Sequence, residues 1–341
     1  MSAALSIPPH SLSIVVPFYN EEDNIVPLVK RVHEALVGYE HPWELVLVDD
    51  GSSDATVDRA VQCSREYGTH VRVVELTRNF KQTAAMQAGL DAARGDVIVT
   101  MDGDLQNDPI DIPRMVGRLL REDLDLVAGW RKNRKDGMIL RKIPSKIANR
   151  LIARITGVHL QDYGCSLKAF RATAIKSVRL YGEMHRFIPA WLATVTTPRK
   201  IAQEEVTHHA RMFGESKYGI SRTFRVILDL IFVYFFMRFR TRPGHFFGGI
   251  GLALGALGIL ILTYLTGLKI FTGASIGTRP MFFGGFFFVI AGVQMVTSGV
   301  LAELLTRVYF ESGQSQAYVA RETAALTDGQ GWHSTNGKSA S

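Results

Sequence analysis

Cysteine is scarce in this sequence, which holds only Cys63 and Cys165 among 341 residues. Two cysteines are too few for a disulfide framework, and they fit a reducing compartment. Residues 1–10 form a short N-terminal tail that lacks a basic stretch followed by an apolar run, so we expect no cleaved signal peptide. These absences predict that the part of the chain that precedes the two C-terminal apolar runs stays in the cytoplasm.

Features of nucleic-acid binding are also lacking, although the chain is basic. The formal net charge is +7 at pH 7 and the pI is about 9.4. We find neither a basic face interleaved with aromatic residues nor a known reading motif, so we expect no nucleic-acid partner. The positive charge instead fits another polyanion or the surface of a lipid bilayer.

Two carboxylates one residue apart, Asp102 and Asp104, follow an apolar run at residues 96–101. Carboxylates at the end of a buried strand are costly to desolvate unless a cation joins them. Mg²⁺ or Mn²⁺ is the natural partner, because hard divalent ions prefer carboxylate oxygens and often share the phosphate oxygens of a nucleotide. An acidic turn is the alternative. The pattern indicates a nucleotide-diphosphate site.

Apolar runs alternate with helical stretches through the first 130 residues. We expect strands at 12–17, 43–48, 71–76, 96–101 and 126–129, and helices at 21–37, after 49–54 and at 82–93. This alternation predicts an α/β fold with a mainly parallel sheet and helices on both faces. Ligands of such sheets bind outside the carboxyl ends of the strands, where the polar clusters of this sequence fall.

Two uncharged apolar runs lie near the C-terminus, at residues 246–268 and 281–301. Each exceeds the roughly 20 residues that cross a bilayer, and the short link between them predicts an antiparallel hairpin. A helix pair buried in a soluble core is the alternative. Arginines that precede the first run and follow the second predict cytoplasmic termini at the plasma (inner) membrane.

Eight segments resemble, in this order, the family 2 inverting glycosyltransferases. They are 16–21 (VPFYNE), 48–54 (VDDGSSD), 78–80 (RNF), 102–106 (DGDLQ), 129–131 (GWR), 162–171 (DYGCSLKAFR), 185–189 (HRFIP) and 213–219 (FGESKYG). With the hairpin, they look like the polyprenyl-phosphate glycosyltransferases, a group that includes dolichyl-phosphate mannose synthase, polyprenyl-phosphate glucosyltransferases and undecaprenyl-phosphate aminoarabinose transferase.

The resemblance implies a GT-A catalytic domain at residues 11–217. Amphipathic interfacial helices are expected at 218–245, for which a third span is the alternative. A two-span region follows at 246–310, with helices at about 246–268 and 281–305, and then a disordered tail at 311–341. Two transmembrane helices attached to a large catalytic domain favour a homo-oligomer.

On the donor side, the resemblance assigns residues to a nucleotide-diphosphate sugar. Pro17, Tyr19 and Glu21 match the positions that cradle the base and ribose, and Asp50 matches the one that contacts the base. Asp49 and Arg78 also fall among the nucleotide-sugar positions. Asp49 has an alternative role as a capping or loop-ordering carboxylate.

The same resemblance assigns Asp102, Asp104 and Gln106 to a bound Mg²⁺ or Mn²⁺. In this interpretation Asp104 is a catalytic residue, because the ion that it holds stabilises the leaving diphosphate. The alternative for Asp102 is that it faces the hydroxyl groups of the sugar more than the metal ion.

The acceptor side is assigned to four residues. Arg131 matches a phosphate-contacting arginine, Asp162 matches an acidic position near the acceptor, and Lys217 lies in a loop that contacts phosphate, with Arg211 close by. The alternatives are a solvated cation at Arg131 and a contact of Lys217 with anionic lipid. A phosphate acceptor is already anionic, so Asp162 has an orienting role as the alternative to that of a base.

These assignments predict transfer of a single sugar to a polyprenyl phosphate with inversion. The chain lacks the Gln-x-x-Arg-Trp sequence of the processive synthases. UDP-glucose is the first candidate donor, with GDP-mannose and UDP-linked amino sugars as alternatives. A hydroxyl acceptor such as diacylglycerol, and a membrane scaffold that only senses nucleotide sugar, are the competing hypotheses.

Overall fold

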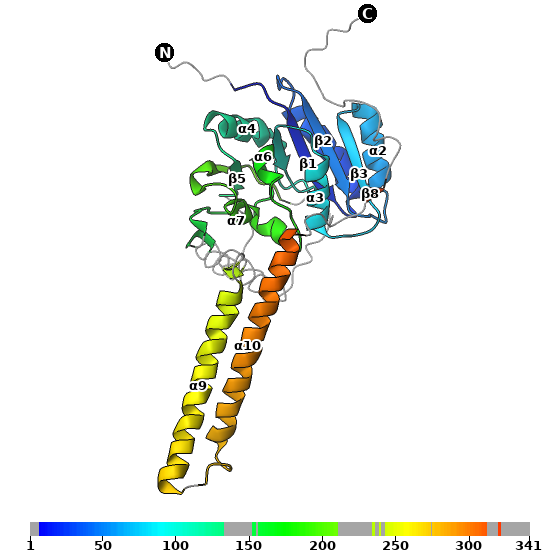
Figure 1. Cartoon of the computed structure of the whole chain (residues 1–341). Coiled ribbons are helices and arrows are strands. Elements are labelled where there is room, and N and C mark those ends of the chain that lie inside the picture. Colours follow the sequence, from blue (N-terminus) through cyan, green and yellow to red (C-terminus); the bar gives the residue numbers. More distant parts are fainter. Residues whose placement is uncertain are drawn as a thin grey trace, which may run out of the picture. The chain divides into compact units, whose positions relative to one another are not determined.

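The computed structural model describes residues 7–132, 152–154, 156–210, 234–235, 239, 243–273, 275–311 and 320–321. The chain divides into two compact units, one formed by Met1–Leu230 with Gln316–Ser341 and the other by Ile231–Ser315. The first unit holds a β-sheet with helices, and the second holds two long helices (Figure 1).

The first unit is built on one mixed sheet of eight strands in the order β7-β5-β6-β4-β1-β2-β3-β8. The strands are β1 Leu12–Phe18, β2 Trp43–Asp49, β3 Val71–Leu76, β4 Val97–Thr100, β5 Leu126–Trp130, β6 Lys168–Arg171, β7 Ile201–Glu205 and β8 Ala320–Arg321. Four neighbouring pairs are parallel, whereas β6 runs antiparallel to both β4 and β5, and β8 runs antiparallel to β3.

Helices cover both faces of this sheet. The longer ones are α1 Glu22–Ala35, α2 Thr56–Tyr67, α3 Gln82–Ala92 and α4 Ile112–Arg121, and the short ones are η1 Pro109–Asp111, α6 Ala172–Ile175, η2 Met184–Phe187, α7 Ile188–Leu192 and η3 Pro198–Lys200. Alternate residues of β1, such as Ile14 and Val16, share one core with α1, α2 and α4. Val15 points the other way, against α3, where a Cβ added at Gly89 would lie 2.2 Å from its Cγ1.

The strand order contains a switch point between β1 and β4. The chain lays down β1, β2 and β3 toward one edge, and then returns to place β4 on the other side of β1. In open α/β sheets a ligand crevice forms outside the carboxyl ends of the strands at such a point. The loops after β1 and β4 are therefore where the fold positions a ligand.

The predicted α/β sheet with helices on both faces is confirmed. The strand expected at 71–76 has those bounds, and each of the other predicted strands differs by one residue at one or both ends. β6, β7 and β8 have no counterpart among the predicted strands. β6 has four residues and carries Lys168 and Arg171, and β7 ends in two glutamates, so neither presents an apolar run.

The second unit is an antiparallel hairpin of α9 Pro243–Thr272 and α10 Pro280–Glu311 (Figure 1). Both helices are long and apolar enough to cross a bilayer, and most of their side chains are exposed rather than packed in a core. The predicted pair of apolar helices is confirmed, and each helix extends beyond its predicted ends. The predicted interfacial helices at 218–245 and tail at 311–341 lie largely outside the described residues.

Glycines let the two helices of the hairpin approach closely. A Cβ added at Gly251 would lie 2.7 Å from the Gly292 carbonyl oxygen, and one added at Gly258 would lie 2.7 Å from that of Gly285. Gly248 has no such neighbour within 4 Å, so it faces away from the partner helix. Small residues at the contact are the usual means by which helices pack in membranes.

Candidate active site

The Asp102–Asp104 turn is shaped by the strand beside it. β1 pairs with β4, and a Cβ added at Gly103 would lie 2.4 Å from Cε1 of the buried Phe18 ring at the end of β1. Leu105 then takes a positive φ of 61°, which turns the chain away from the strand direction. Glycine between the two aspartates is therefore a packing requirement.

Asp102 is held from two directions. Gln82 Nε2, in the first turn of α3, donates to Asp102 Oδ1 at 3.0 Å, and the side chain of Ser166 forms a second hydrogen bond with the same carboxylate. Burial raises the pKa of Asp102, and the charge of Asp104 raises it further. A cation at this place would relieve both effects.

The donor set at this turn fits a hard divalent cation. Asp104 Oδ1 accepts the backbone N–H of Gln106 at 3.2 Å, and the Gln106 carbonyl accepts the N–H of His209 at 2.8 Å. In the described part of the chain no group of three or more His, Cys, Asp or Glu side chains could hold a metal by itself. Mg²⁺ commonly binds through one or two carboxylates completed by substrate phosphates and water.

The two aspartates that end β2 differ in how their oxygens are satisfied. Asp50 Oδ1 accepts the N–H of Phe80 at 2.7 Å, and burial raises the pKa of Asp50. Asp49 Oδ2 accepts the N–H of Ser52 at 2.9 Å, which is the loop-ordering role. Asp49 Oδ1 is buried without a hydrogen-bond partner among the described residues.

The loop after β1 is tied to the loop after β2. Asn20, at a φ of 54°, accepts the N–H of Ser53 on Oδ1 and donates its own N–H to Ser52 Oγ, both at 2.9 Å. The ring of Tyr19 is 46% exposed beside this junction, which leaves a face open for stacking. These two bonds fix the shape of the loop at the carboxyl end of β1.

The other predicted nucleotide residues are placed as follows. Pro17 lies within β1 opposite Val48 of β2, so it shapes the strand end rather than facing a ligand freely. The carboxylate of Glu21 accepts a hydrogen bond from the side chain of Asn24. Arg78 stacks over the ring of Phe80, with 4.5 Å from Cζ to the ring centroid.

Arg131 and Asp162 form a bidentate ion pair. Arg131 Nε lies 2.7 Å from Asp162 Oδ2 and Nη2 lies 3.0 Å from Oδ1, with both side chains largely buried. Burial alone would lower the pKa of Arg131, but the hydrogen bond and charge of Asp162 outweigh it and raise that pKa. Arg131 is therefore a fixed cation inside the fold and not a solvated one.

Lys168 is a buried lysine that our sequence assignments do not include, and burial lowers its pKa. It lies on β6, is 2% exposed, and donates from Nζ to the Cys165 carbonyl. Asp102 and Asp162 both interact with its charge. The only sequence signal was a lysine in a segment otherwise built of small and apolar residues.

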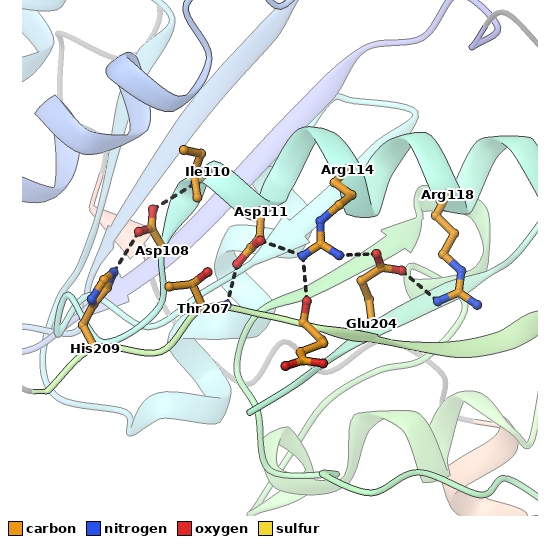
Figure 2. Close-up of polar contacts among 9 residues, drawn as sticks. Asp108, Ile110, Asp111, Arg114, Arg118, Glu204, Thr207 and His209 are labelled. Carbon is orange, nitrogen blue, oxygen red and sulfur yellow. Dashed lines mark hydrogen bonds and ion pairs between the residues drawn. The ribbon is translucent and has the colours of Figure 1, made fainter. Parts of the chain in front are cut away.

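The strand that leads toward Arg211 and Lys217 is anchored by the network in Figure 2. Arg114 bonds to Asp111 at 2.7 Å and to the Glu205 carbonyl at 2.6 Å, and Asp111 accepts the N–H of Thr207 at 2.7 Å. His209 Nε2 lies 2.8 Å from Asp108 Oδ2. Arg211 and Lys217 themselves lie outside the described residues.

Two comparisons place these motifs in a family. Residues 13–179 match the model of glycosyl transferase family 2. A dodecaprenyl-phosphate galacturonate synthase from Rhizobium johnstonii is 61% identical over 311 residues, which cover 91% of this chain and 92% of the relative. The chain belongs to the polyprenyl-phosphate glycosyltransferases of family 2.

Further likenesses of this family 2 glycosyltransferase agree with that assignment. An undecaprenyl-phosphate 4-deoxy-4-formamido-L-arabinose transferase from Pectobacterium carotovorum is 34% identical over 316 residues, with 92% of this chain and 94% of the relative covered. Glucosyl-3-phosphoglycerate synthase from Mycobacterium tuberculosis, solved with Mg²⁺ and uridine diphosphate, has a TM-score of 0.51 at 21% identity over 66% of this chain and 79% of that one. The structural likeness shows the GT-A fold. With its apolar hairpin, the glycosyltransferase is a membrane protein.

Proposed function

We propose that this glycosyltransferase moves one galacturonic acid residue from a nucleotide-diphosphate sugar to a polyprenyl phosphate, with inversion at the anomeric carbon. The 61% identity to a dodecaprenyl-phosphate galacturonate synthase, spread over nine tenths of both chains, carries the choice of sugar and acceptor. Uridine diphosphate is the first carrier to test. UDP-glucose, our candidate from the sequence, is not confirmed and becomes an alternative.

The donor occupies the crevice between β1 and β4 in this proposal. Tyr19 and the unpartnered oxygen of Asp49 meet the base and ribose, and Asp50, Glu21 and Arg78 complete that wall. The diphosphate lies at the turn after β4, where Asp102, Asp104 and Gln106 would hold Mg²⁺ or Mn²⁺. A bound divalent cation would neutralise charge on the departing diphosphate.

The acceptor phosphate enters beside Arg131 in this proposal. One phosphate oxygen forms a bond to the anomeric carbon while the bond from that carbon to the diphosphate oxygen breaks, so the nucleoside diphosphate leaves. The attacking oxygen is already anionic, so no base has to remove a proton. Asp162 accepts hydrogen bonds from Nε and Nη2 of the Arg131 guanidinium group and thereby orients this cation. Lys217 and Arg211 are proposed as further phosphate contacts.

The reaction is proposed to take place at the cytoplasmic face of the plasma membrane, with both termini cytoplasmic and the protein a homo-oligomer. The second candidate donor is an amino-sugar nucleotide, because the 34% identical relatives are 4-deoxy-4-formamido-L-arabinose transferases. A membrane scaffold that senses nucleotide sugar is the non-enzymatic alternative.

A transfer assay tests the proposal. The purified full-length protein is incubated with Mn²⁺, undecaprenyl phosphate and a panel of radiolabelled nucleotide sugars that includes UDP-galacturonic acid, UDP-glucose, GDP-mannose and an amino-sugar donor. We expect labelled polyprenyl-phosphate sugar from the galacturonic acid donor, and a loss of at least about 1,000-fold in Asp104→Ala, because the ion lost supplies several kcal/mol to the transition state.

Three results would contradict the proposal. Preference for UDP-glucose or an amino sugar would overturn the choice of donor, and a product that retains the donor's configuration would exclude single displacement. A protein that binds the donors but transfers none would support the sensing scaffold.

A further inference from the structure

A buried amide side chain lies directly after the acidic turn of the site. Asn107 is 3% exposed, and it has no part in the proposed binding of donor or acceptor. An amide is costly to bury unless its polar groups are hydrogen-bonded. The contacts that satisfy Asn107 connect the turn to two segments that lie far from it in the sequence.

The side chain of Asn107 bonds to the segment that follows Asp162. Nδ2 of Asn107 donates to Ser166 Oγ at 2.7 Å, and Oδ1 accepts a weaker hydrogen bond from the Cys165 thiol at 3.9 Å. Asp162, three residues before Cys165, accepts hydrogen bonds from Nε and Nη2 of Arg131. One side chain therefore ties the end of the acidic turn to the segment that orients Arg131.

The backbone of Asn107 is paired with the chain that leaves β7. Asn107 forms an antiparallel β-bridge with His208, and the N–H of His209 donates at 2.8 Å to the carbonyl of the residue before Asn107. Asp111 fixes the same stretch, because its Oδ2 accepts the N–H of Thr207 at 2.7 Å (Figure 2). The chain after β7 thus runs alongside the end of the turn.

Both segments converge on β5 just before Arg131. The N–H of Gly129 donates to the Leu167 carbonyl at 2.9 Å. A Cβ added at Gly129 would lie 2.9 Å from Cys165 Sγ and 3.0 Å from Val206 Cγ2, so glycine permits a close approach of both segments to the strand. The buried asparagine therefore contacts two segments that pack against β5 beside Arg131.

We propose that Asn107 is a positioning residue that aligns the acidic turn with Arg131 during sugar transfer. The inference rests on the proposed function, in which the turn holds the diphosphate of the donor and Arg131 holds the phosphate of the acceptor. The new bond to the anomeric carbon requires both substrates in the correct orientation, and a displacement of about 1 Å can lower the rate roughly 100-fold. Asn107 joins the turn to both segments that pack beside Arg131.

Steady-state kinetics of Asn107→Leu test this role. Leucine has a similar volume and forms no side-chain hydrogen bond, so the substitution removes the links to Ser166 and Cys165 and keeps the core filled. The full-length protein is assayed with undecaprenyl phosphate, Mn²⁺ and UDP-galacturonic acid, or with the member of the donor panel that gives the highest transfer. We expect kcat to fall about 30-fold and the KM values of donor and acceptor to stay within about threefold, because each substrate keeps its own contacts.

Ser166→Ala shows whether Asn107 acts through its bonded partner. We expect kcat to fall about tenfold in this variant, which removes the shorter of the two side-chain hydrogen bonds. The double variant should lie no more than about twofold below Asn107→Leu, because that bond is already absent in the single variant.

Gln87→Leu is the matched control. Gln87 on α3 is 4% exposed, donates to Asp91 at 2.9 Å and accepts the N–H of Leu180 at 2.7 Å. The substitution removes two hydrogen bonds of another buried amide, and neither partner is assigned to a substrate. It should lower the thermal unfolding midpoint about as much as Asn107→Leu does, and leave kcat within about threefold of the wild type.

An unchanged kcat in Asn107→Leu would overturn the inference, and so would a rise in KM that accounts for the whole loss of activity. Additive losses in the double variant would show that Asn107 does not act through Ser166, which also overturns it. If Asn107→Leu does not fold, Ser166→Ala decides, and an unchanged kcat there overturns the inference. A wild-type protein that transfers no sugar from any donor overturns the proposed function and this inference together, whereas an active wild type confines the failure to Asn107.

Discussion

The proposed donor half and the proposed acceptor half of the catalytic unit are held together in different ways. The donor half comprises the loops after β1, β2, β3 and β4, and its contacts join backbone groups to neighbouring side chains, such as Phe80 N–H with Asp50 and Ser52 N–H with Asp49. The acceptor half comprises β5, β6, β7 and their loops. It depends on side-chain ion pairs such as Arg131 with Asp162.

This difference has a consequence for what each half tolerates. Backbone-to-carboxylate bonds fix loop shape and survive changes of charge that keep an acceptor oxygen. A buried bidentate ion pair fixes a charge, and removal of either partner leaves the other uncompensated. Outside the proposed metal ligands, we therefore expect charge substitutions to be most harmful in the acceptor half, and shape substitutions to be most harmful in the donor half.

Apart from loss of the proposed metal ligand Asp104, the largest effect is expected for Arg131→Lys in the acceptor half. Lysine keeps the charge but not the fork that meets both oxygens of Asp162, so we expect the transfer rate to fall by roughly 100-fold. The affinity for uridine diphosphate with Mn²⁺ should change by less than about threefold, because the donor half does not use this fork. Steady-state transfer assays and equilibrium binding measure the two quantities.

Lys132→Met is the matched control for this variant. Lys132 is the next cation along the chain, is about half exposed, and pairs with Glu205 at 3.1 Å. Its loss should leave transfer within about threefold of the wild type, as for other exposed pairs. An equal loss of donor affinity in Arg131→Lys would show that the two halves are not separate.

The same difference explains what could be predicted from the sequence. The donor half lies on consecutive strand–helix units, so its residues can be recognised by their positions at strand ends. The strand at 71–76 and the position of Asp102 after a strand could therefore be predicted from the local pattern alone. The buried position of Lys168 could not, because it results from β6 lying antiparallel between β4 and β5. The pairing of Arg131 with Asp162, 31 positions away, likewise depends on tertiary folding.

The ends of the two long helices could not be predicted from composition alone. The uncharged runs predicted the two membrane-spanning helices. In the structure, α9 and α10 extend beyond these runs and include charged residues such as Lys269 and Glu303. Helix continuation there follows from backbone hydrogen bonding and not from hydrophobicity. Glu303 accepts the N–H of Gly244 at 3.3 Å, a contact between two helices that no local pattern reveals.

A shape substitution in the donor half is expected to have an intermediate effect. Gly103→Ala places a methyl group 2.4 Å from Cε1 of Phe18, so the turn must shift. We expect about tenfold weaker binding of Mn²⁺ with uridine diphosphate, since overpacking costs about 1–3 kcal/mol. Gly103→Ala combined with Phe18→Leu should recover part of that binding.

Gly164→Ala is the control in the acceptor half. A methyl group there meets only ordinary contacts, 3.7 Å from Arg131 Nη2 and from Asp162 Oδ1. Binding and transfer should stay close to those of the wild type. A loss in Gly164→Ala as large as in Gly103→Ala would contradict the distinction between shape in one half and charge in the other.

The smallest effect is expected for Asp50→Asn, a charge substitution in the donor half. Burial raises the pKa of Asp50 in the folded protein, so the folded state favours the protonated carboxyl and loses stability as pH rises through that pKa. Asparagine keeps an oxygen for the Phe80 N–H and carries no charge. We expect its thermal unfolding midpoint at pH 8 to exceed that of the wild type by about 2 °C.

The pH dependence makes this last comparison decisive. The gap between Asp50→Asn and the wild type should close as pH is lowered through the folded pKa of Asp50, because the wild-type carboxyl then becomes neutral as well. Asp58→Asn, an exposed change on α2, should show no gap at any pH. A lower midpoint for Asp50→Asn at pH 8 would mean that the ionised carboxylate stabilises the donor half, and that charge matters there as it does beside Arg131.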